Sequence, residues 1–160
     1  MEPRLNPTKV APAAYRAMAA LESYVKHSSN LERPLLELVR MRASQINGCA
    51  YCLDMHSKDA RAAGETEQRL YTLDAWRETP FFTDRERAAL AWTEAITLIA
   101  SSHAEDEVYE EARKQFSEEE LVNLTLAIVT INGWNRLSIG FRAVPGKYQP
   151  AAHKSASGKS

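Results

Sequence analysis

Apolar residues recur at helical spacing along most of the chain, and no stretch shows the apolar/polar alternation that is typical of a strand. Between residues 12 and 27, for example, Tyr15, Met18, Leu21 and Val25 fall on one stripe near the 3.6-residue helical period. The helices predicted in this way span residues 12–27, 34–46, 49–64, 66–76, 83–100, 102–115 and 117–142. The sequence therefore predicts an all-α fold, a helical bundle of six to seven helices.

Polar residues and glycine mark where several of these helices begin and end. Capping boxes open two of them, at Thr83 with Glu86 and at Ser117 with Glu120. The Asn-Gly pair at residues 47–48 ends the second helix, because asparagine and glycine tolerate the left-handed conformation of a helix terminus. These signals fix the start of the two helices predicted from residues 83 and 117, and the end of the helix that precedes the cysteines.

The last predicted helix and the residues after it set the domain organisation. The helix over 117–142 is apolar on most of its circumference, which favours a central core helix that also forms a subunit interface. Residues 147–160 are rich in glycine, serine, lysine and proline and read as a flexible tail. We therefore expect one helical domain over residues 1–146, and a homo-oligomer.

Composition and charge exclude several functional classes. The chain has 160 residues, 44% of them hydrophobic and 26% charged, which suits one folded core. Twenty basic and twenty-one acidic side chains leave a net charge of -1, so no broad basic surface is available for nucleic acid. The sequence lacks the apolar run of a signal peptide or a membrane span. We expect a cytoplasmic protein with neither a nucleic-acid nor a membrane partner.

Both cysteines lie in one short segment, Cys49-Ala-Tyr-Cys52-Leu-Asp-Met-His56. On a helix, positions 49, 52 and 56 share one stripe. Cys49 falls at the helix start, where unpaired N–H groups and the helix dipole favour an anion. Such positions lower a cysteine pKa from about 8.5 to between roughly 3.5 and 7.5. In a reducing cytosol the pair therefore indicates a redox-active or metal-binding site rather than a structural disulfide.

Glu37 supplies a candidate partner for His56. If the turn at residues 47–48 sets its two helices antiparallel, Glu37 lies about 15 Å before the turn and His56 about 12 Å after it. A carboxylate and an imidazole at the same level could take the proton of Cys52 and protonate a leaving group. The alternative is a solvated ion pair of Glu37 with Arg33 or Arg40.

Other interpretations of the cysteines remain open at this point. Cysteines are among the residues most often buried, so the pair could simply be part of the core. Zinc is a second alternative, with four potential ligands in Cys49, Cys52, His56 and Glu37. Structural zinc usually takes a second ligand pair from a separate segment, and the sequence has no second CxxC. A c-type haem is excluded, because Leu53 stands where that motif requires histidine.

The run from Glu37 to His56, with eleven residues between Glu37 and Cys49, resembles the signature of the alkylhydroperoxidase D and carboxymuconolactone decarboxylase superfamily. The resemblance extends over about residues 12–146 and includes Ile131-Asn-Gly-Trp-Asn-Arg136 in the last helix. It implies a small, single-core, oligomeric member of the alkylhydroperoxidase D branch. The implied activity is that of a thiol-dependent peroxidase without a bound cofactor.

The resemblance also implies a role for each site residue. Cys52 is the peroxidatic cysteine, Cys49 resolves it as a disulfide, and Glu37 and His56 hold the positions of the proton relay. Tyr51 departs from the best-known peroxidases, which have histidine there. Because a tyrosine takes no proton near neutral pH, we expect a weaker relay and a low peroxidase rate. Tyr51 can still donate a hydrogen bond, which makes it a candidate accessory residue. The position of Cys49 at the helix start, in contrast, favours Cys49 as the more acidic thiol.

Partners and alternative functions follow from the same resemblance. Peroxide is the implied substrate, a lipoyl-bearing adaptor or thioredoxin-like protein the implied dithiol reductant, and a dimer, trimer or hexamer the implied assembly. One alternative is a thiol–disulfide oxidoreductase without strong peroxidase activity, and another is a noncatalytic zinc-binding oligomer. A carboxymuconolactone-type decarboxylase does not need a cysteine pair, so Cys49 and Cys52 argue against that activity.

Overall fold

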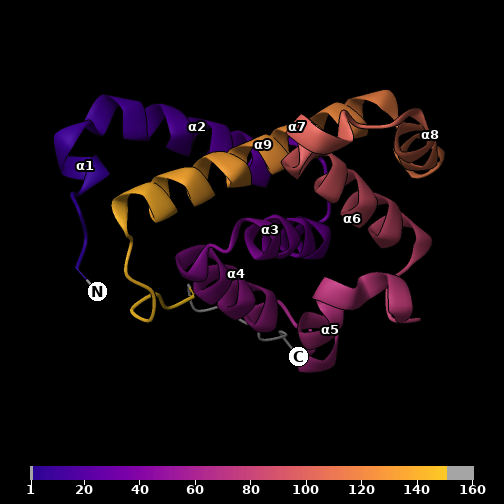
Figure 1. The fold of residues 1–160 in the computed structure, drawn as a ribbon, viewed down its shortest axis with the longest axis horizontal. Helices are drawn as coiled ribbons and strands as arrows, with labels where there is room; N and C mark the ends of the chain where they lie inside the picture. The colour runs from indigo at the N-terminus through magenta and orange to yellow at the C-terminus, as the bar shows by residue number, and fades with distance from the viewer. Residues whose placement is uncertain (1, 151–160) are drawn as a thin grey trace, which may run out of the picture.

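The computed structural model describes residues 2–150, and every regular element among these residues is a helix (Figure 1). The elements are α1 (Pro7–Val10), α2 (Pro12–Ser28), α3 (Arg33–Asn47), α4 (Ala50–Ala62), α5 (Glu67–Thr72), the 3-10 helix η1 (Leu73–Glu78), α6 (Asp84–Thr97), α7 (Ile99–Ser102), α8 (Asp106–Gln115) and α9 (Glu118–Phe141). The all-α prediction is confirmed for this part of the chain. Residues 151–160, most of the predicted tail, lie outside the described residues.

Strong end signals gave accurate helix boundaries. The helices predicted over 12–27, 34–46 and 117–142 agree with α2, α3 and α9 to within one residue at each end. Both predicted capping boxes form, at Thr83 and at Ser117. Each capping hydroxyl accepts the N–H of the third helical residue, which satisfies a donor that the helix itself leaves unpaired.

Weaker signals gave errors at three places. The helix predicted from residue 102 begins only at Asp106, because the Ser102 hydroxyl donates to the carbonyl of Ala95 at 2.6 Å instead of capping α8. The helix predicted over 83–100 is interrupted at Leu98, and the one predicted over 66–76 changes from α-helix to 3-10 helix at Leu73, where η1 begins. The four-residue helices α1 and α7 were not expected, so the predicted number of helices was too low.

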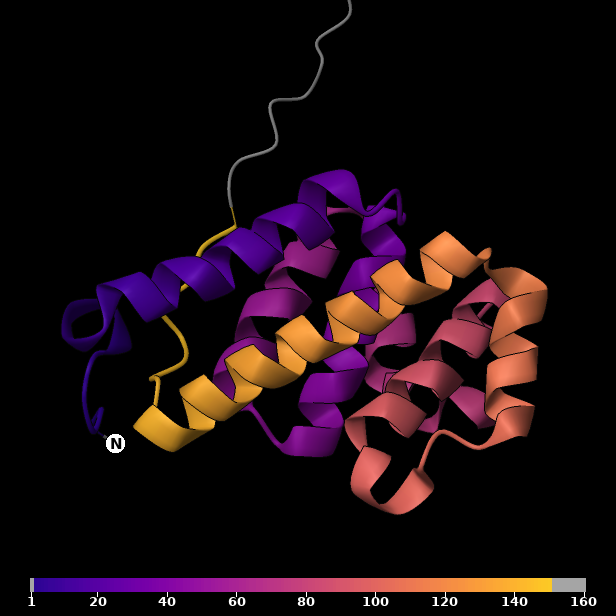
Figure 2. The same cartoon turned by 90° about the horizontal axis from the view of Figure 1, so that it is seen from above.

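Helix α3 lies at the centre of the bundle (Figure 1). It packs against α9 on one side and α4 on the other, with α6 beside it. Helix α2 runs antiparallel next to α9, as the view from above shows (Figure 2). Fully buried apolar side chains join these layers, among them Leu38, Val39, Leu90, Leu124 and Ile128. Each contributes about 1.5–3 kcal/mol by leaving water, and together they hold α3 against α6 and α9.

Helix α9 buries one face and exposes apolar side chains on another. Leu124, Ile128 and Ile131 are in the core, whereas Val122 is 60% and Val129 48% exposed. The exposed valines fit the subunit interface expected from the sequence, and the homo-oligomer remains a prediction. No helix in residues 2–150, the 24-residue α9 included, is long and apolar enough to cross a membrane.

Candidate active site

The turn between α3 and α4 positions the cysteine pair. Gly48 has a φ of 67°, in the left-handed region that ends a helix, and its N–H donates back to the carbonyl of Gln45 at 3.1 Å. Cys49 follows in an extended conformation as the N-cap of α4, and its sulfur accepts the backbone N–H of Cys52 at 3.4 Å. The predicted position of Cys49 at the helix start is confirmed.

The two thiols are free, buried and in contact. Their Sγ atoms lie 2.8 Å apart, and each cysteine is about 1% exposed. A disulfide has an S–S bond of about 2.05 Å, so only a small movement is needed to close one. The pair packs in an apolar cluster with Ala43, Ile131, Tyr51 and Trp134. The core-residue interpretation is thus right about burial, but it does not account for the N-cap position and the direct contact between the sulfurs.

The two thiols differ in acidity. The side-chain hydrogen bond from Cys52 outweighs burial and, together with the Cys52 backbone N–H, lowers the pKa of Cys49 to about 7. The same contact, followed by burial, raises the pKa of Cys52. The first negative charge of the pair therefore rests on Cys49, as the helix-start argument predicts. The family resemblance, by contrast, gives peroxide attack to Cys52.

Helix α9 contributes polar groups that the sequence analysis missed. Asn135 is fully buried; its Oδ1 accepts from Asn47 at 2.8 Å and its Nδ2 donates to the Ser44 hydroxyl at 3.0 Å. The amide also acts to lower the pKa of both thiols, although for Cys52 the contact with Cys49 and burial outweigh this and raise the pKa. Ser138, almost one turn further on, has its hydroxyl 3.8 Å from the Cys52 sulfur. In the sequence, the signal that could have found them is the presence of asparagine and serine at positions 135 and 138 of an otherwise apolar helix.

We expect Asn135→Leu to reduce both stability and thiol acidity. Leucine removes the donor to Ser44 and one acceptor of Asn47, so the free energy of unfolding should fall by about 1–3 kcal/mol. The thiolate also loses an N–H donor, so the pKa for iodoacetamide alkylation should rise. Urea unfolding and alkylation rates across pH measure the two effects, with the exposed Val129→Leu as the control. An unchanged alkylation profile would contradict the role given to Asn135.

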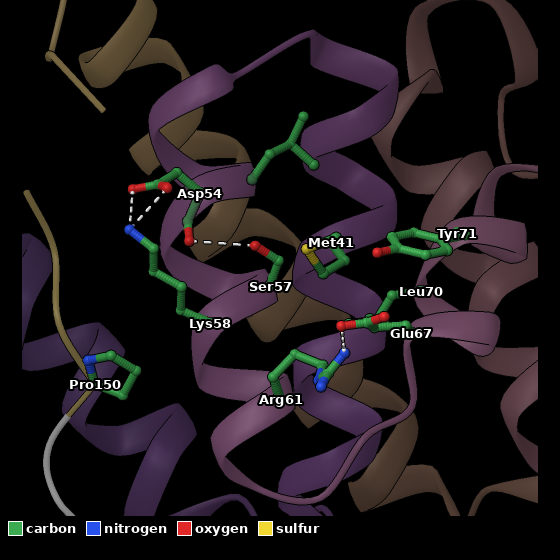
Figure 3. A pocket seen from close by; sticks show the side chains of 10 residues that line it. Met41, Asp54, Ser57, Lys58, Arg61, Glu67, Leu70, Tyr71 and Pro150 are labelled. Carbon is green, nitrogen blue, oxygen red and sulfur yellow. Dashed lines mark hydrogen bonds and ion pairs between the residues drawn. The ribbon is translucent and has the colours of Figure 1, made fainter. Parts of the chain in front are cut away.

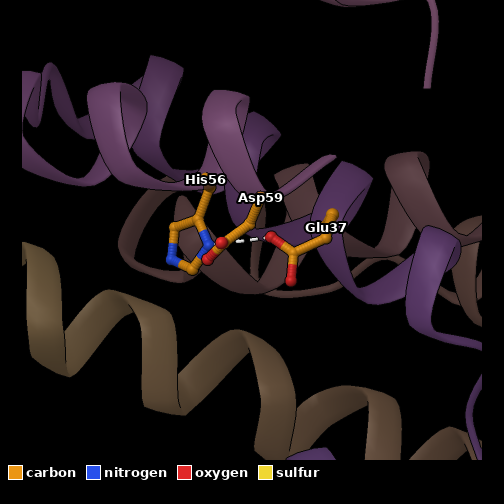
Figure 4. A group of neighbouring side chains, drawn as sticks. All are labelled: Glu37, His56 and Asp59. Atoms are coloured by element: carbon orange, nitrogen blue, oxygen red, sulfur yellow. Dashed lines mark hydrogen bonds and ion pairs between the residues drawn. The ribbon is translucent and has the colours of Figure 1, made fainter. Parts of the chain in front are cut away.

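Glu37 and His56 meet where α3 packs on α4 (Figure 4). Glu37 Oε2 lies 2.8 Å from His56 Nδ1, and Glu37 Oε1 accepts from Arg40 at 2.8 Å. Burial acts to raise the pKa of Glu37, but His56 and Arg40 more than offset it and hold that pKa below its usual value. The prediction that Glu37 and His56 lie at the same level is confirmed. The ion pair with Arg40 also exists, but it is buried instead of solvated.

A second carboxylate, that of Asp59, lies beside this pair. One potential ligand atom each of Glu37, His56 and Asp59 falls within 4.8 Å of the others (Figure 4). Within residues 2–150 the grouped metal-ligand candidates include neither cysteine, so the four potential ligands of the zinc alternative do not converge. Arg40 and Tyr148 already bind the two carboxylates. The site therefore has two parts: the dithiol at the start of α4, and the pair that Glu37 of α3 forms with His56, about one turn further along α4.

Hollows in the surface lie to either side of α4. The larger, about 650 Å³, is on the outer face near α5, and its charged groups are paired as Lys58 with Asp54 and Arg61 with Glu67 (Figure 3). It is lined by neither cysteine. A smaller hollow of about 350 Å³ is lined by Glu37 at the other end of the site. Glu37 therefore borders a surface hollow, whereas neither cysteine lines one of these two hollows.

Comparison with known proteins agrees with this geometry. The sequence model of the Carboxymuconolactone decarboxylase family matches residues 12–95. The uncharacterised protein YdfG of Bacillus subtilis is 48% identical over 139 residues, covering 87% of this chain and 94% of YdfG. Similarity to YdfG thus includes the whole α3–turn–α4 unit.

Solved structures with a similar arrangement of helices are also known. A protein of unknown function from Agrobacterium tumefaciens, with a suggested identity as the antioxidant defence protein AhpD, superposes with a TM-score of 0.88. It is 46% identical, and the match covers 92% of this chain and all of that one. A peroxidase-related protein with an alkylhydroperoxidase AhpD core from Ralstonia eutropha has a TM-score of 0.76 at 18% identity, covering 88% and 74% of the two chains. This second likeness concerns the fold alone.

Proposed function

The chain belongs to the carboxymuconolactone decarboxylase family, and from this premise we propose that it is a thiol-dependent peroxidase of the alkylhydroperoxidase type. The observation that carries the proposal is the pair of buried, reduced sulfurs 2.8 Å apart, on the same helix face as His56. The suggested antioxidant role of the Agrobacterium relative gives further support. The similarity to the alkylhydroperoxidase D superfamily seen in the sequence is confirmed by the family match and by the fold.

The proposed cycle begins with one proton leaving the dithiol. His56 donates its Nδ1 proton to Glu37, so its Nε2 is the basic nitrogen that takes a thiol proton. The remaining proton is shared across the 2.8 Å sulfur contact, so the charge can move from Cys49 to Cys52. Tyr51, which is half-buried beside the sulfurs, is an accessory residue in this proposal.

The thiolate of Cys52 then attacks the peroxide. Its sulfur bonds to the terminal oxygen of R–O–O–H, the O–O bond breaks, and the alkoxide takes the proton held by His56 and leaves as an alcohol. Cys52 is now a sulfenic acid. Cys49 gives its remaining proton to His56, and its thiolate attacks this sulfur; the expelled hydroxide takes that proton and leaves as water, and a Cys49–Cys52 disulfide remains. Two thiols are thus oxidised by two electrons while one peroxide is reduced.

An external dithiol must reduce the disulfide before the next cycle. Exchange is fastest when the departing thiol has the lower pKa, so the incoming thiolate should attack Cys52 and release Cys49. A lipoyl-bearing adaptor or a thioredoxin-like protein has the required pair of thiols. We place this cycle in the cytosol, where such reductants keep thiols reduced. A homo-oligomer, as dimer, trimer or hexamer, is part of the same proposal.

Thiol–disulfide exchange is the second candidate function. An N-cap cysteine with a lowered pKa favours it, because that arrangement suits a thiolate that attacks disulfides. The tyrosine at position 51, in place of a basic residue, also favours it. In this case Cys49 would be the attacking sulfur and peroxide would be a poor substrate.

The proposed function is tested by the mass and free-thiol count of the reduced protein before and after brief exposure to one equivalent of an organic hydroperoxide. We expect the loss of two hydrogens and of both thiols within seconds, because the sulfurs are already in contact. Two free thiols that persist after exposure would rule out the peroxidase. Oxidation by a disulfide such as oxidised lipoamide, but not by peroxide, would support the second candidate.

A further inference from the structure

The chain folds back onto α4 after α9 ends (Figure 1). Residues 146–148, which we name the C-terminal clasp, contact three side chains of α4. The Gly146 N–H donates to Asp54 at 2.9 Å, Lys58 donates to the Tyr148 carbonyl at 3.1 Å, and the Tyr148 hydroxyl contacts Asp59. The composition of residues 147–160 predicted a flexible tail, and these contacts fall at its beginning.

The Tyr148 hydroxyl binds the carboxylate of Asp59, which lies next to the Glu37–His56 pair. Its oxygen lies 2.8 and 2.9 Å from the two oxygens of Asp59, so one hydrogen is shared between them. Burial, followed by this hydrogen bond, raises the pKa of Tyr148 to about 12. The phenol therefore remains a donor throughout the pH range in which the first thiol, Cys49, ionises.

Two carboxylates lie close enough to compete for one imidazole. Asp59 comes almost one turn after His56 on α4, and potential ligand atoms of Asp59, His56 and Glu37 converge within 4.8 Å (Figure 4). Each carboxylate has its own restraint: Arg40 binds Glu37 and Tyr148 binds Asp59. Without the phenol, Asp59 would keep its charge in a half-buried position and would gain by turning toward His56.

We propose that Tyr148 is a positioning residue, whose phenol holds the Asp59 carboxylate away from His56 so that Glu37 remains the partner of His56 Nδ1. The imidazole then keeps one orientation, with Nε2 available for the proton of the thiol pair. The effect on catalysis rests on the proposed peroxidase function. The effect on His56 does not, because it concerns the hydrogen bonds of the resting protein alone.

The test combines Tyr148→Phe, which removes only the hydroxyl, with Asp59→Asn, which removes the competing charge. We expect Tyr148→Phe to shift the ¹⁵N signals of His56 and to slow dithiol alkylation by iodoacetamide about tenfold, a fraction of what an intact proton relay contributes. Adding Asp59→Asn should return both readouts to within about twofold of the parent protein, because the competing carboxylate is gone. Tyr71→Phe, at a tyrosine 76% exposed on α5, is the matched control.

Two results would overturn the proposal. One is a Tyr148→Phe protein with unchanged His56 signals and alkylation rate. The other is a slowed alkylation rate that persists in the double variant. It would mean that the Tyr148 hydroxyl supports the local fold and does not determine which carboxylate pairs with His56. Neither readout uses peroxide, so failure of the peroxidase function would appear separately, as a parent protein whose thiols alkylate normally but do not react with hydroperoxide.

Discussion

Cys52→Ser is expected to abolish peroxide consumption, lowering the rate by at least about a thousandfold, as removal of a reacting nucleophile does in other enzymes. Serine fits the same buried space beside Ser138, so the fold should be retained. Its hydroxyl does not form an anion near neutral pH, and it cannot be oxidised to a sulfenic acid. Consumption of hydroperoxide under steady supply of a dithiol reductant measures the effect.

Cys49→Ser is the matched variant and should behave differently. Cys52 can still attack one equivalent of peroxide, but no second sulfur lies 2.8 Å away to close the disulfide. Dimedone, which labels sulfenic acids, should therefore trap Cys52 after a single turnover. The reverse pattern, with dimedone on Cys49 in Cys52→Ser and no reaction of Cys49→Ser, would exchange the two roles. The lower pKa of Cys49 makes this a real alternative.

The parts of the site that the sequence predicted are held together by local structure. Cys49, Cys52 and His56 lie on one short helix, so their spacing fixes their common face. Glu37 is reached across a single tight turn, and the rise per residue was enough to place it opposite His56. Helix boundaries with capping boxes were likewise predictable, because the capping interaction is complete within four residues.

The missed residues are those that depend on the register between distant elements. Asn135 reaches Ser44 across 91 positions, and Tyr148 reaches Asp59 across 89. A hydrophobic pattern shows which face of α9 is buried, but it does not give the axial position of that face against α3. Composition gave no sign of the clasp for a related reason: it does not show that Tyr148 has a hydrogen-bond partner 89 positions away. The flexible tail expected over residues 147–160 stays a prediction.

Glu37→Gln is expected to lower the peroxide-dependent rate about a hundredfold, the contribution typical of a positioned acid–base group. Glutamine has one acceptor oxygen, whereas Glu37 accepts from both His56 and Arg40. Whichever way the amide turns, its NH₂ group faces a donor. The imidazole loses the anion that stabilises its protonated form, so the pKa for thiol alkylation should rise. The alkylation rate measured across pH tests this directly.

The same substitution should change stability in a pH-dependent way. The pKa of Glu37 is lowered in the folded protein from 4.5, so its ionised form stabilises the fold above about pH 4.5, and this is lost as pH falls through the lowered pKa. Near pH 7, Glu37→Gln should cost about 3 kcal/mol, because a buried ion pair loses one partner. The difference in unfolding free energy from the parent should shrink in acid. Urea unfolding at several pH values measures it.

Glu94→Gln separates the effect of the Glu37–His56 pair from simple loss of a half-buried, ion-paired charge. Glu94 accepts from Arg42 at 2.8 Å, from Trp76 at 2.9 Å and from Arg77, and its pKa is also lowered, yet none of these partners belongs to the cluster around the dithiol. Glu94→Gln should therefore destabilise the protein without moving the alkylation profile. If both glutamine variants shift that profile equally, Glu37 acts on the thiols only through the stability of the fold. A shift confined to Glu37→Gln would leave the carboxylate–imidazole pair as the group that sets thiol reactivity.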